Sequence, residues 1–184
     1  MGDQRTSIIP SSIRRMFDGR VFSLVVERVT LPKGHVLDME IIRHPGSVVL
    51  IPTLDDGRLM LVRQYRHAIG KWVWELPAGT LKKDEAPEAA AARECQEEIG
   101  LIPGQLTRLQ SLFPTPGYCD EEMHYFLATA LRTPGPTDPI LPPDEDEDIE
   151  TRAFTLAEIH AAMASGDVVD MKTVAGLVLL GAQG

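Results

Sequence analysis

Cysteine, long apolar runs and basic residues are all scarce in this sequence, and each shortage excludes a class of protein. Cys95 and Cys119 are the only cysteines among 184 residues and are not in C-x-x-C spacing, which excludes a disulfide framework. No apolar run approaches the ~20 residues that cross a bilayer, and residues 1–15 lack the continuous apolar stretch of a signal peptide. We therefore expect a cytoplasmic protein whose cysteines are small, reduced thiols.

Basic residues are outnumbered by acidic ones. Lysine and arginine total 18 against 27 aspartates and glutamates, giving a formal net charge of −9 and an isoelectric point near 5.0. Nucleic acids and anionic membranes bind to clustered lysine and arginine, so neither is expected as a partner. If the ligand is an anion, positive charge must be added locally, and a metal ion would add it.

The chain is long enough for one folded domain with an accessory element. An apolar fraction of 43% is normal for a buried core and excludes disorder over the whole length. From residue 20 to about 42, two β-rich stretches flank a Pro-Lys-Gly-His turn and predict a small antiparallel sheet. We therefore divide the chain into an N-terminal β element (1–42) and a main domain (43–184).

In the main domain, strands and helices mix without a regular βαβ alternation, which predicts an α+β sandwich. The turn signal Asp55-Asp56-Gly57 predicts a hairpin between strands 47–52 and 58–65. Further strands are expected over 71–77, 106–113, 124–130 and 151–154. Helices are expected over 87–99, between Pro87 and Gly100, from the capping-box sequence at 155–158, and over 171–180.

Three glutamates share one face of the predicted helix 87–99. Glu94, Glu97 and Glu98 stand at i, i+3 and i+4, so their carboxylates repel each other, and only Arg93 is near to offset the charge. A hard divalent cation such as Mg²⁺ would explain the pattern, because it takes oxygen ligands from a few carboxylates, water and substrate phosphates. Taken alone, a glutamate-rich face is more often solvated surface, so the flanking sequence must decide.

The flanking residues fit a known motif. Seven residues stand at its fixed spacing: Gly79, Glu85, Arg93, Glu94, Glu97, Glu98 and Gly100. This stretch resembles the Nudix box, and seven such identities arise by chance in only ~10⁻⁸ of windows. The resemblance implies a Nudix hydrolase with an α/β/α sandwich fold, which cuts a nucleoside diphosphate linked to another group with the help of Mg²⁺, Mn²⁺ or another divalent ion.

The resemblance also implies roles for the box residues. Gly79 is expected to let its loop turn, so that a backbone carbonyl faces the metal. Arg93 and Glu85 are expected to pair with each other or with the helix carboxylates and so to assist catalysis by holding the ligands. Ala89 to Ala92 and Cys95 are expected to pack the helix closely on the sheet. The metal ligands would be the Ala78 carbonyl, Glu94, Glu97 and Glu98, with Glu98 also counted as catalytic.

Two other segments are similar to the ADP-ribose pyrophosphatase subfamily. They are Leu61-Val62-Arg63-Gln64-Tyr65-Arg66, followed by Trp74-Glu75-Leu76-Pro77-Ala78-Gly79, and Phe113-Pro114-Thr115-Pro116-Gly117-Tyr118-Cys119-Asp120-Glu121. The resemblance implies substrate contacts at Arg66, Glu75, Pro116 and Gly117. Arg66 would clamp the diphosphate, since a guanidinium offers two parallel donors; the alternative is an exposed charge at a strand end.

The acidic run 144–150 has two interpretations. Six acids in seven residues are typical of a solvated loop. The resemblance instead implies a loop that closes over the substrate, with Glu145 as the general base for the attacking water and Glu147 as its neighbour. It further implies a homodimer that exchanges the N-terminal sheet between subunits, with Arg28 and Glu40 as candidate substrate contacts.

We therefore expect water to displace a phosphate of ADP-ribose, giving AMP and ribose 5-phosphate. An alternative substrate is GDP-mannose or a related nucleotide sugar, because the Pro-Gly segment is partly shared. A different function would be that of a non-catalytic sensor of ADP-ribose-like ligands, although a protein that only binds its ligand does not need three adjacent carboxylates. A calcium-binding module is not expected, because its Asp/Asn/Gly loop is absent.

Overall fold

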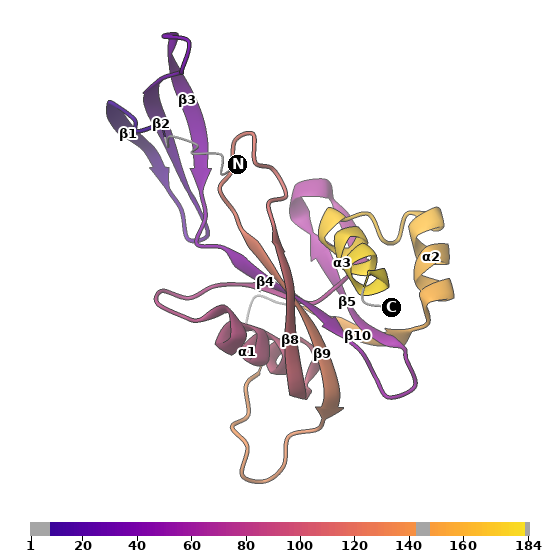
Figure 1. Cartoon of the computed structure of the whole chain (residues 1–184). Helices are drawn as coiled ribbons and strands as arrows, with labels where there is room; N and C mark the ends of the chain where they lie inside the picture. Colours follow the sequence, from indigo (N-terminus) through magenta and orange to yellow (C-terminus); the bar gives the residue numbers. More distant parts are fainter. Residues whose placement is uncertain (1–7, 143–147, 183–184) are drawn as a thin grey trace.

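A computed structural model describes residues 8–142 and 148–182, and its mixture of sheets and helices confirms the α+β class (Figure 1). The elements are β1 (Ser12–Asp18), β2 (Ser23–Thr30), β3 (Val36–Arg43), β4 (Ser47–Pro52), β5 (Leu59–Arg66), β6 (Lys71–Glu75), β7 (Ala78–Thr80), α1 (Pro87–Ile99), β8 (Ile102–Leu112), β9 (Met123–Arg132), β10 (Glu150–Phe154), α2 (Leu156–Ser165) and α3 (Met171–Gly181). A 3-10 turn, His67–Ile69, joins β5 to β6. Among the described residues, no helix has both the length and the apolar character to cross a membrane.

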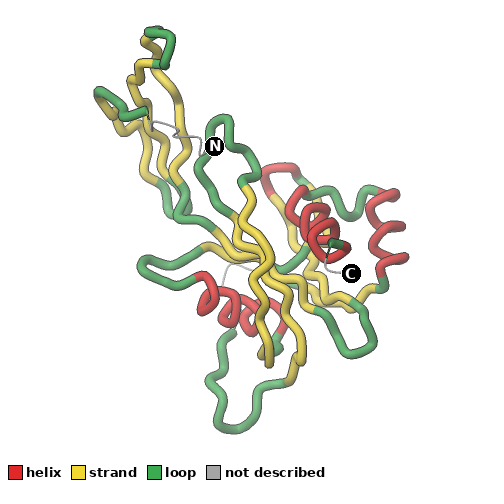
Figure 2. The backbone as a smooth tube through the Cα atoms, in the orientation of Figure 1, coloured by secondary structure: helices red, strands yellow, loops and turns green. Residues whose placement is uncertain are grey.

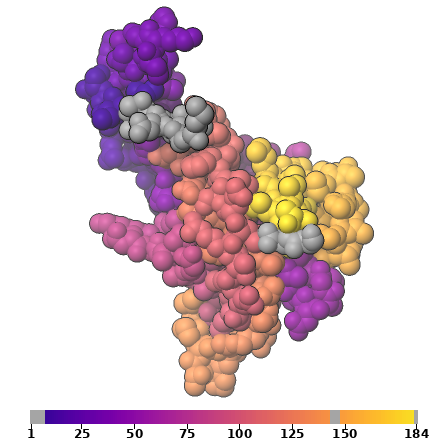
Figure 3. All heavy atoms as spheres, viewed as in Figure 1, coloured from indigo at the N-terminus to yellow at the C-terminus, as the bar shows by residue number. Residues whose placement is uncertain are grey.

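The N-terminal sheet has the order β1-β2-β3 and is antiparallel, as expected. It projects from the rest of the molecule as a separate lobe (Figure 3). Its first strand was not expected from the sequence, which showed β-rich stretches only from residue 20. All seven residues of β1 are exposed, so they carry no burial pattern that a strand prediction could use.

Strand β4 is the centre of the main domain. It lies between β7 and β9 in a sheet of order β7-β4-β9-β8, pairing parallel to β9. All six of its residues are buried, and alternate side chains enter opposite cores. Val48 and Leu50 pack on the α1 side, whereas Val49 and Ile51 pack on the side of α2 and α3. Figure 2 shows strands between helices on two sides, which is the expected α/β/α sandwich.

The predicted hairpin of strands 47–52 and 58–65 is wrong. The turn forms, since the Leu54 amide donates to the Arg58 carbonyl at 2.9 Å, but beyond this hydrogen bond the strand pairing is limited to one isolated bridge from Thr53 to Leu59. Strand β5 then enters a second sheet of order β10-β5-β6. It cannot pair along β4, because both edges of β4 are already taken by β7 and β9.

Helix α1 has the predicted bounds. Pro87 occupies its first turn, Gly100 ends it with φ of 69°, and Ala86 provides no side-chain cap. The expectation that Ala89 to Ala92 all pack on the sheet is wrong: 89 and 92 are exposed, whereas 90, 91 and Cys95 are buried. Four consecutive helical residues span more than one face, so they cannot all point inward.

The last two helices begin as the sequence predicted. Thr155 and Glu158 form both halves of the capping box at the start of α2. The carboxylate of Asp170 accepts from the Thr173 amide and caps α3. Strand β8 begins at residue 102, four residues before the predicted start, because its pairing with β9 extends beyond its apolar part.

Candidate active site

Arg93 organises the glutamate face of α1. Its guanidinium donates from Nε and Nη2 to the two carboxylate oxygens of Glu85, at 2.8 and 2.9 Å. Nη1 donates to Glu94 at 2.6 Å and to Glu97 at 2.5 Å. The hydrogen bonds to Glu85 raise the pKa of Arg93 and lower that of Glu85, so both groups are charged at neutral pH. The expected pairing of Arg93 and Glu85 is therefore present.

Strand β7 touches the same glutamates. The Ala78 amide donates to Glu98 Oε2 at 3.0 Å. A Cβ atom on Gly79 would lie 1.9 Å from the carboxylate carbon of Glu94, so only glycine leaves room for that carboxylate. The expected reason for this glycine was wrong: it lies in a strand paired with Val48, and its φ is not in the left-handed region. It provides space and not a turn.

The carboxylates of this face are oxygen donors of the chemical type that a hard divalent cation takes. Glu94 and Glu98 are buried at 8% and 7% exposure, and the space at Gly79 is shaped around one of these carboxylates. Oxygen donors of this kind suit Mg²⁺ or Mn²⁺. Within residues 8–142 and 148–182, however, no three His, Cys, Asp or Glu side chains form a group that could hold a metal ion, and Arg93 donates to both Glu94 and Glu97.

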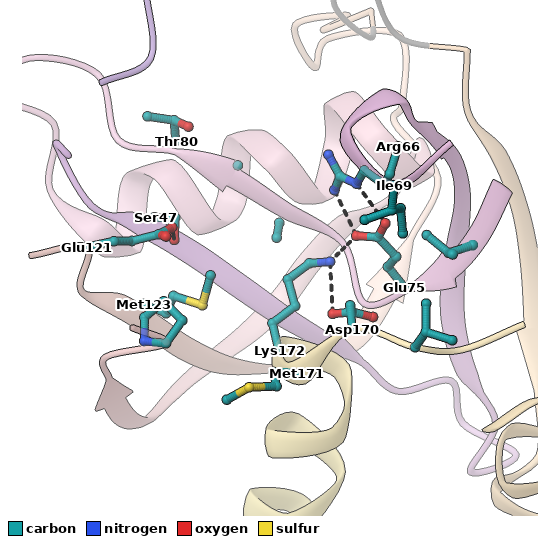
Figure 4. Close-up of a pocket in the computed structure, with 15 residues that line it drawn as sticks. Ser47, Arg66, Ile69, Glu75, Thr80, Glu121, Met123, Asp170, Met171 and Lys172 are labelled. Atoms are coloured by element: carbon teal, nitrogen blue, oxygen red, sulfur yellow. Dashed lines mark hydrogen bonds and ion pairs between the residues drawn. The ribbon is translucent and has the colours of Figure 1, made fainter. Parts of the chain in front are cut away.

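Only part of the Arg66 guanidinium is available to bind a phosphate. Its Nε and Nη2 donate to the two carboxylate oxygens of Glu75, both at 2.7 Å (Figure 4). Glu75 is 1% exposed and also binds the ammonium of Lys172, which in turn contacts Asp170 at 3.1 Å. Burial alone would raise the pKa of Glu75, but the hydrogen bond from Arg66 and the charge of Lys172 together lower it. The group is thus a buried ionic cluster.

Two cavities adjoin at Arg66 and β7. The glutamate cavity, of about 510 Å³, includes Arg93 and Glu94 in its lining. The lysine cavity, of about 480 Å³, includes Glu75, Asp170 and Lys172 (Figure 4). Arg66 and residues 78–80 line both. The two cavities therefore meet at Arg66 and strand β7.

The Pro116-Gly117 turn lies beside the end of β3. The Ile42 amide donates to the Tyr118 carbonyl at 2.7 Å, and the Asp120 amide donates back to the Ile42 carbonyl at 3.1 Å. Neither Pro116 nor Gly117 lines the two cavities, although Pro114 lines the lysine cavity. Their expected contact with substrate stays a prediction.

The candidate contacts in the N-terminal sheet lie apart from the cavities. Arg28 pairs with Asp38 on the neighbouring strand at 3.3 Å, and Glu40 is exposed on β3. Neither lines the glutamate or the lysine cavity, whereas Arg20, at the turn between β1 and β2, lines the glutamate cavity. The proposed base Glu145 and its neighbour Glu147 lie outside the described residues.

Sequence reasoning missed Lys172 and Asp170. They stand about a hundred residues after Glu75 and belong to no motif, so spacing could not join them. One signal was available: a lysine in the first turn of a helix opposes the helix dipole, which favours acidic residues there.

Comparisons with known proteins agree with the resemblance of residues 79–100 to the Nudix box. The family model of the NUDIX domain matches residues 43–172. An ADP-ribose pyrophosphatase of Bacillus subtilis is 37% identical over 159 residues, which cover 86% of this chain and 84% of that protein. A methanol dehydrogenase activator of Bacillus methanolicus is 36% identical, covering 87% and 85%. An ADP-ribose pyrophosphatase of Mycobacterium tuberculosis is 33% identical, covering 91% and 80%.

A solved structure shows the same fold. The crystal structure of an ADP compounds hydrolase superposes with a TM-score of 0.81, covering 97% of this chain and 94% of that one. Its sequence is 22% identical. The likeness therefore includes the N-terminal sheet as well as the sandwich.

Proposed function

The chain belongs to the Nudix family, and from that premise we propose that it hydrolyses the diphosphate of ADP-ribose to AMP and ribose 5-phosphate. The observation that carries the proposal is the arrangement around β7. It brings a buried carboxylate face, a strand edge and the cation Arg66 to one pair of adjoining cavities. Relatives named for this activity, at 33 to 37% identity over most of the chain, support the substrate.

We propose Glu94, Glu97, Glu98 and the Ala78 carbonyl as the holders of the divalent ion, with Mg²⁺ as the physiological choice. When bound, such an ion neutralises diphosphate charge and lowers the pKa of water. Arg93 keeps Glu94 and Glu97 in place and reduces their mutual repulsion. The Ala78 amide fixes one oxygen of Glu98.

Arg66 orients the substrate in this proposal. Two of its nitrogens are fixed by Glu75, and its side chain is still 44% exposed, so Nη1 can donate to a diphosphate oxygen. Glu75 thus acts by holding Arg66, since its own carboxylate is buried. We further propose that a second copy of the chain supplies its N-terminal β element (1–42), because the sheet of β1, β2 and β3 projects from its own main domain.

A substrate panel tests this function. The purified protein is incubated with Mg²⁺ and, separately, with ADP-ribose, GDP-mannose, other nucleotide sugars, dinucleoside polyphosphates and NADH. We expect ADP-ribose to be among the best substrates by kcat/KM. A clear preference for another diphosphate would reject the substrate, and binding without turnover of any of them would indicate a sensor.

A further inference from the structure

Glu75 needs more cationic charge than a single surface arginine provides. Its side chain is 2% exposed, and a lone buried carboxylate is strongly destabilising. Arg66 supplies one positive charge, but its side chain is 44% exposed and faces both cavities. Lys172 supplies the second charge and is only 10% exposed. The buried partner of Glu75 is therefore the lysine, and the accessible one is the arginine.

The helix α3 holds Lys172 at this position. Thr173 accepts a hydrogen bond from the Leu76 amide at 2.8 Å, directly after Glu75, and the Lys172 carbonyl accepts one from Tyr125 at 3.2 Å. Gly176 packs so closely on Leu76 that a Cβ there would lie 2.3 Å from a methyl group. These contacts fix the start of α3 against the end of β6.

A lysine at this place is costly by itself. It stands in the first turn of α3, where the helix dipole repels positive charge, and no acidic residue occupies that turn. Asp170 offsets part of the cost through its contact at 3.1 Å. The other carboxylate bound to Lys172, that of Glu75, offsets the rest of the cost.

We propose that Lys172 is a positioning residue, which shares the charge of the buried Glu75 and thereby helps this carboxylate to hold Arg66 with its outward donor, Nη1, available for the substrate diphosphate. Arg66 already bonds both oxygens of Glu75 at 2.7 Å, so without Lys172 it would be the sole countercharge of a buried carboxylate, and the pair that orients it would be less stable. The proposal rests on the proposed function, because it assumes that Arg66 binds a diphosphate. It assigns the C-terminal helix a part in substrate binding although its lysine acts through Glu75.

The test compares Lys172→Met with Lys172→Arg, each in the wild type and in an Arg66→Lys background. Arg66 contacts the diphosphate in ground and transition states alike, so Lys172→Met should raise KM for ADP-ribose with little change in kcat. We expect a rise of roughly tenfold, as for couplings within one salt-bridge network. Lys172→Arg keeps the positive charge and should have a KM close to that of the wild type. In the Arg66→Lys background, Lys172→Met should change KM less than about twofold, since the guanidinium of Arg66 is already absent.

Other outcomes overturn the proposal. An equal rise in KM in both backgrounds would mean that Lys172 contacts the substrate directly. An unchanged KM with a lower urea midpoint would mean that its role is only structural. If Lys172→Met does not fold, Lys172→Gln replaces it, because an amide still donates to Glu75 but carries no charge.

The wild-type protein separates this inference from the function itself. If it cleaves another nucleoside diphosphate better than ADP-ribose, the substrate proposal fails and the same variants are measured on that compound. If it cleaves none, the role of Arg66 fails and the inference fails with it.

Discussion

Replacing Gly79 with alanine should abolish most activity and leave the fold intact. The new Cβ would lie 1.9 Å from the carboxylate carbon of Glu94, whereas carbon atoms in contact prefer about 3.5–4.0 Å. The carboxylate must therefore move by roughly 1.5–2 Å. It cannot do so without breaking its 2.6 Å hydrogen bond from Arg93.

The magnitude follows from that displacement. A misplacement of about 1 Å can cost ~10²-fold in rate, so kcat/KM should fall by at least ~10²-fold, or about 2.7 kcal/mol. Stability should change little, because the crowded atoms are at the tip of a side chain and the backbone at Gly79 is not left-handed. The lower chain entropy of alanine adds about 0.4–1 kcal/mol in favour of the fold.

The assay measures kcat/KM for ADP-ribose across a range of Mg²⁺ concentrations, together with a urea unfolding curve. Gly181→Ala is the matched control, because a Cβ there meets no atom within 4 Å. It should leave kcat/KM and its dependence on Mg²⁺ unchanged, and it should raise the stability by no more than the same entropic gain of about 0.4–1 kcal/mol. Wild-type kcat/KM and metal dependence in Gly79→Ala would refute the claim that the position of Glu94 matters.

Three further predictions concern single groups. Glu98→Gln should lower kcat by about 10²-fold or more and weaken activation by Mg²⁺ in a metal titration, and a full rate would reject Glu98 as a ligand. Burial, with the charge of Glu98 as a smaller cause, raises the pKa of the Cys95 thiol to about 12. A thiol reagent at pH 8 should therefore modify at most Cys119 in the folded protein and both cysteines after unfolding. Modification of two cysteines in the folded protein would contradict this. The pKa of Glu75 in the folded protein is lowered from 4.5, so the stability that its charge gives the folded state is complete above pH 4.5 and is lost as pH falls through the pKa of the folded state. Urea midpoints between pH 6 and 3 should therefore decline more steeply in the wild type than in Glu75→Gln. Equal slopes would be evidence against the ionic cluster.

Features encoded by neighbouring residues were predictable from the sequence. The bounds of α1 follow from Pro87 and Gly100, and the start of α2 follows from a capping box between Thr155 and Glu158. The glutamate face follows from helical spacing alone. In each case the physical cause lies within a few residues of its effect.

Features that depend on distant partners were not predictable. The pairing of β4 with β9 rather than β5 joins segments some 75 residues apart, and no local signal competes with the turn at Gly57. The occupation of Arg66 by Glu75 could have been considered, since both residues were candidates. The contribution of Lys172 could not, because only the packing of α3 on Leu76 brings it there.

Part of the acidic composition, including the glutamate face of α1, is used to place carboxylates in fixed positions near the cavities. Much of the negative charge near the cavities is held by the cations Arg93, Arg66 and Lys172, each bound to at least two carboxylates or to both oxygens of one. These pairs hold carboxylates in fixed positions. A site of this kind is suited to a cation and a diphosphate together.

In the proposed reaction, water cleaves ADP-ribose between its two phosphates. Phosphorus NMR of ADP-ribose incubated with the wild-type protein, with and without Mg²⁺, identifies the products of this reaction. We expect metal-dependent loss of the diphosphate signals and the appearance of two phosphomonoesters, AMP and ribose 5-phosphate. Retention of the diphosphate, or release of ADP and free ribose, would show that this reaction does not take place.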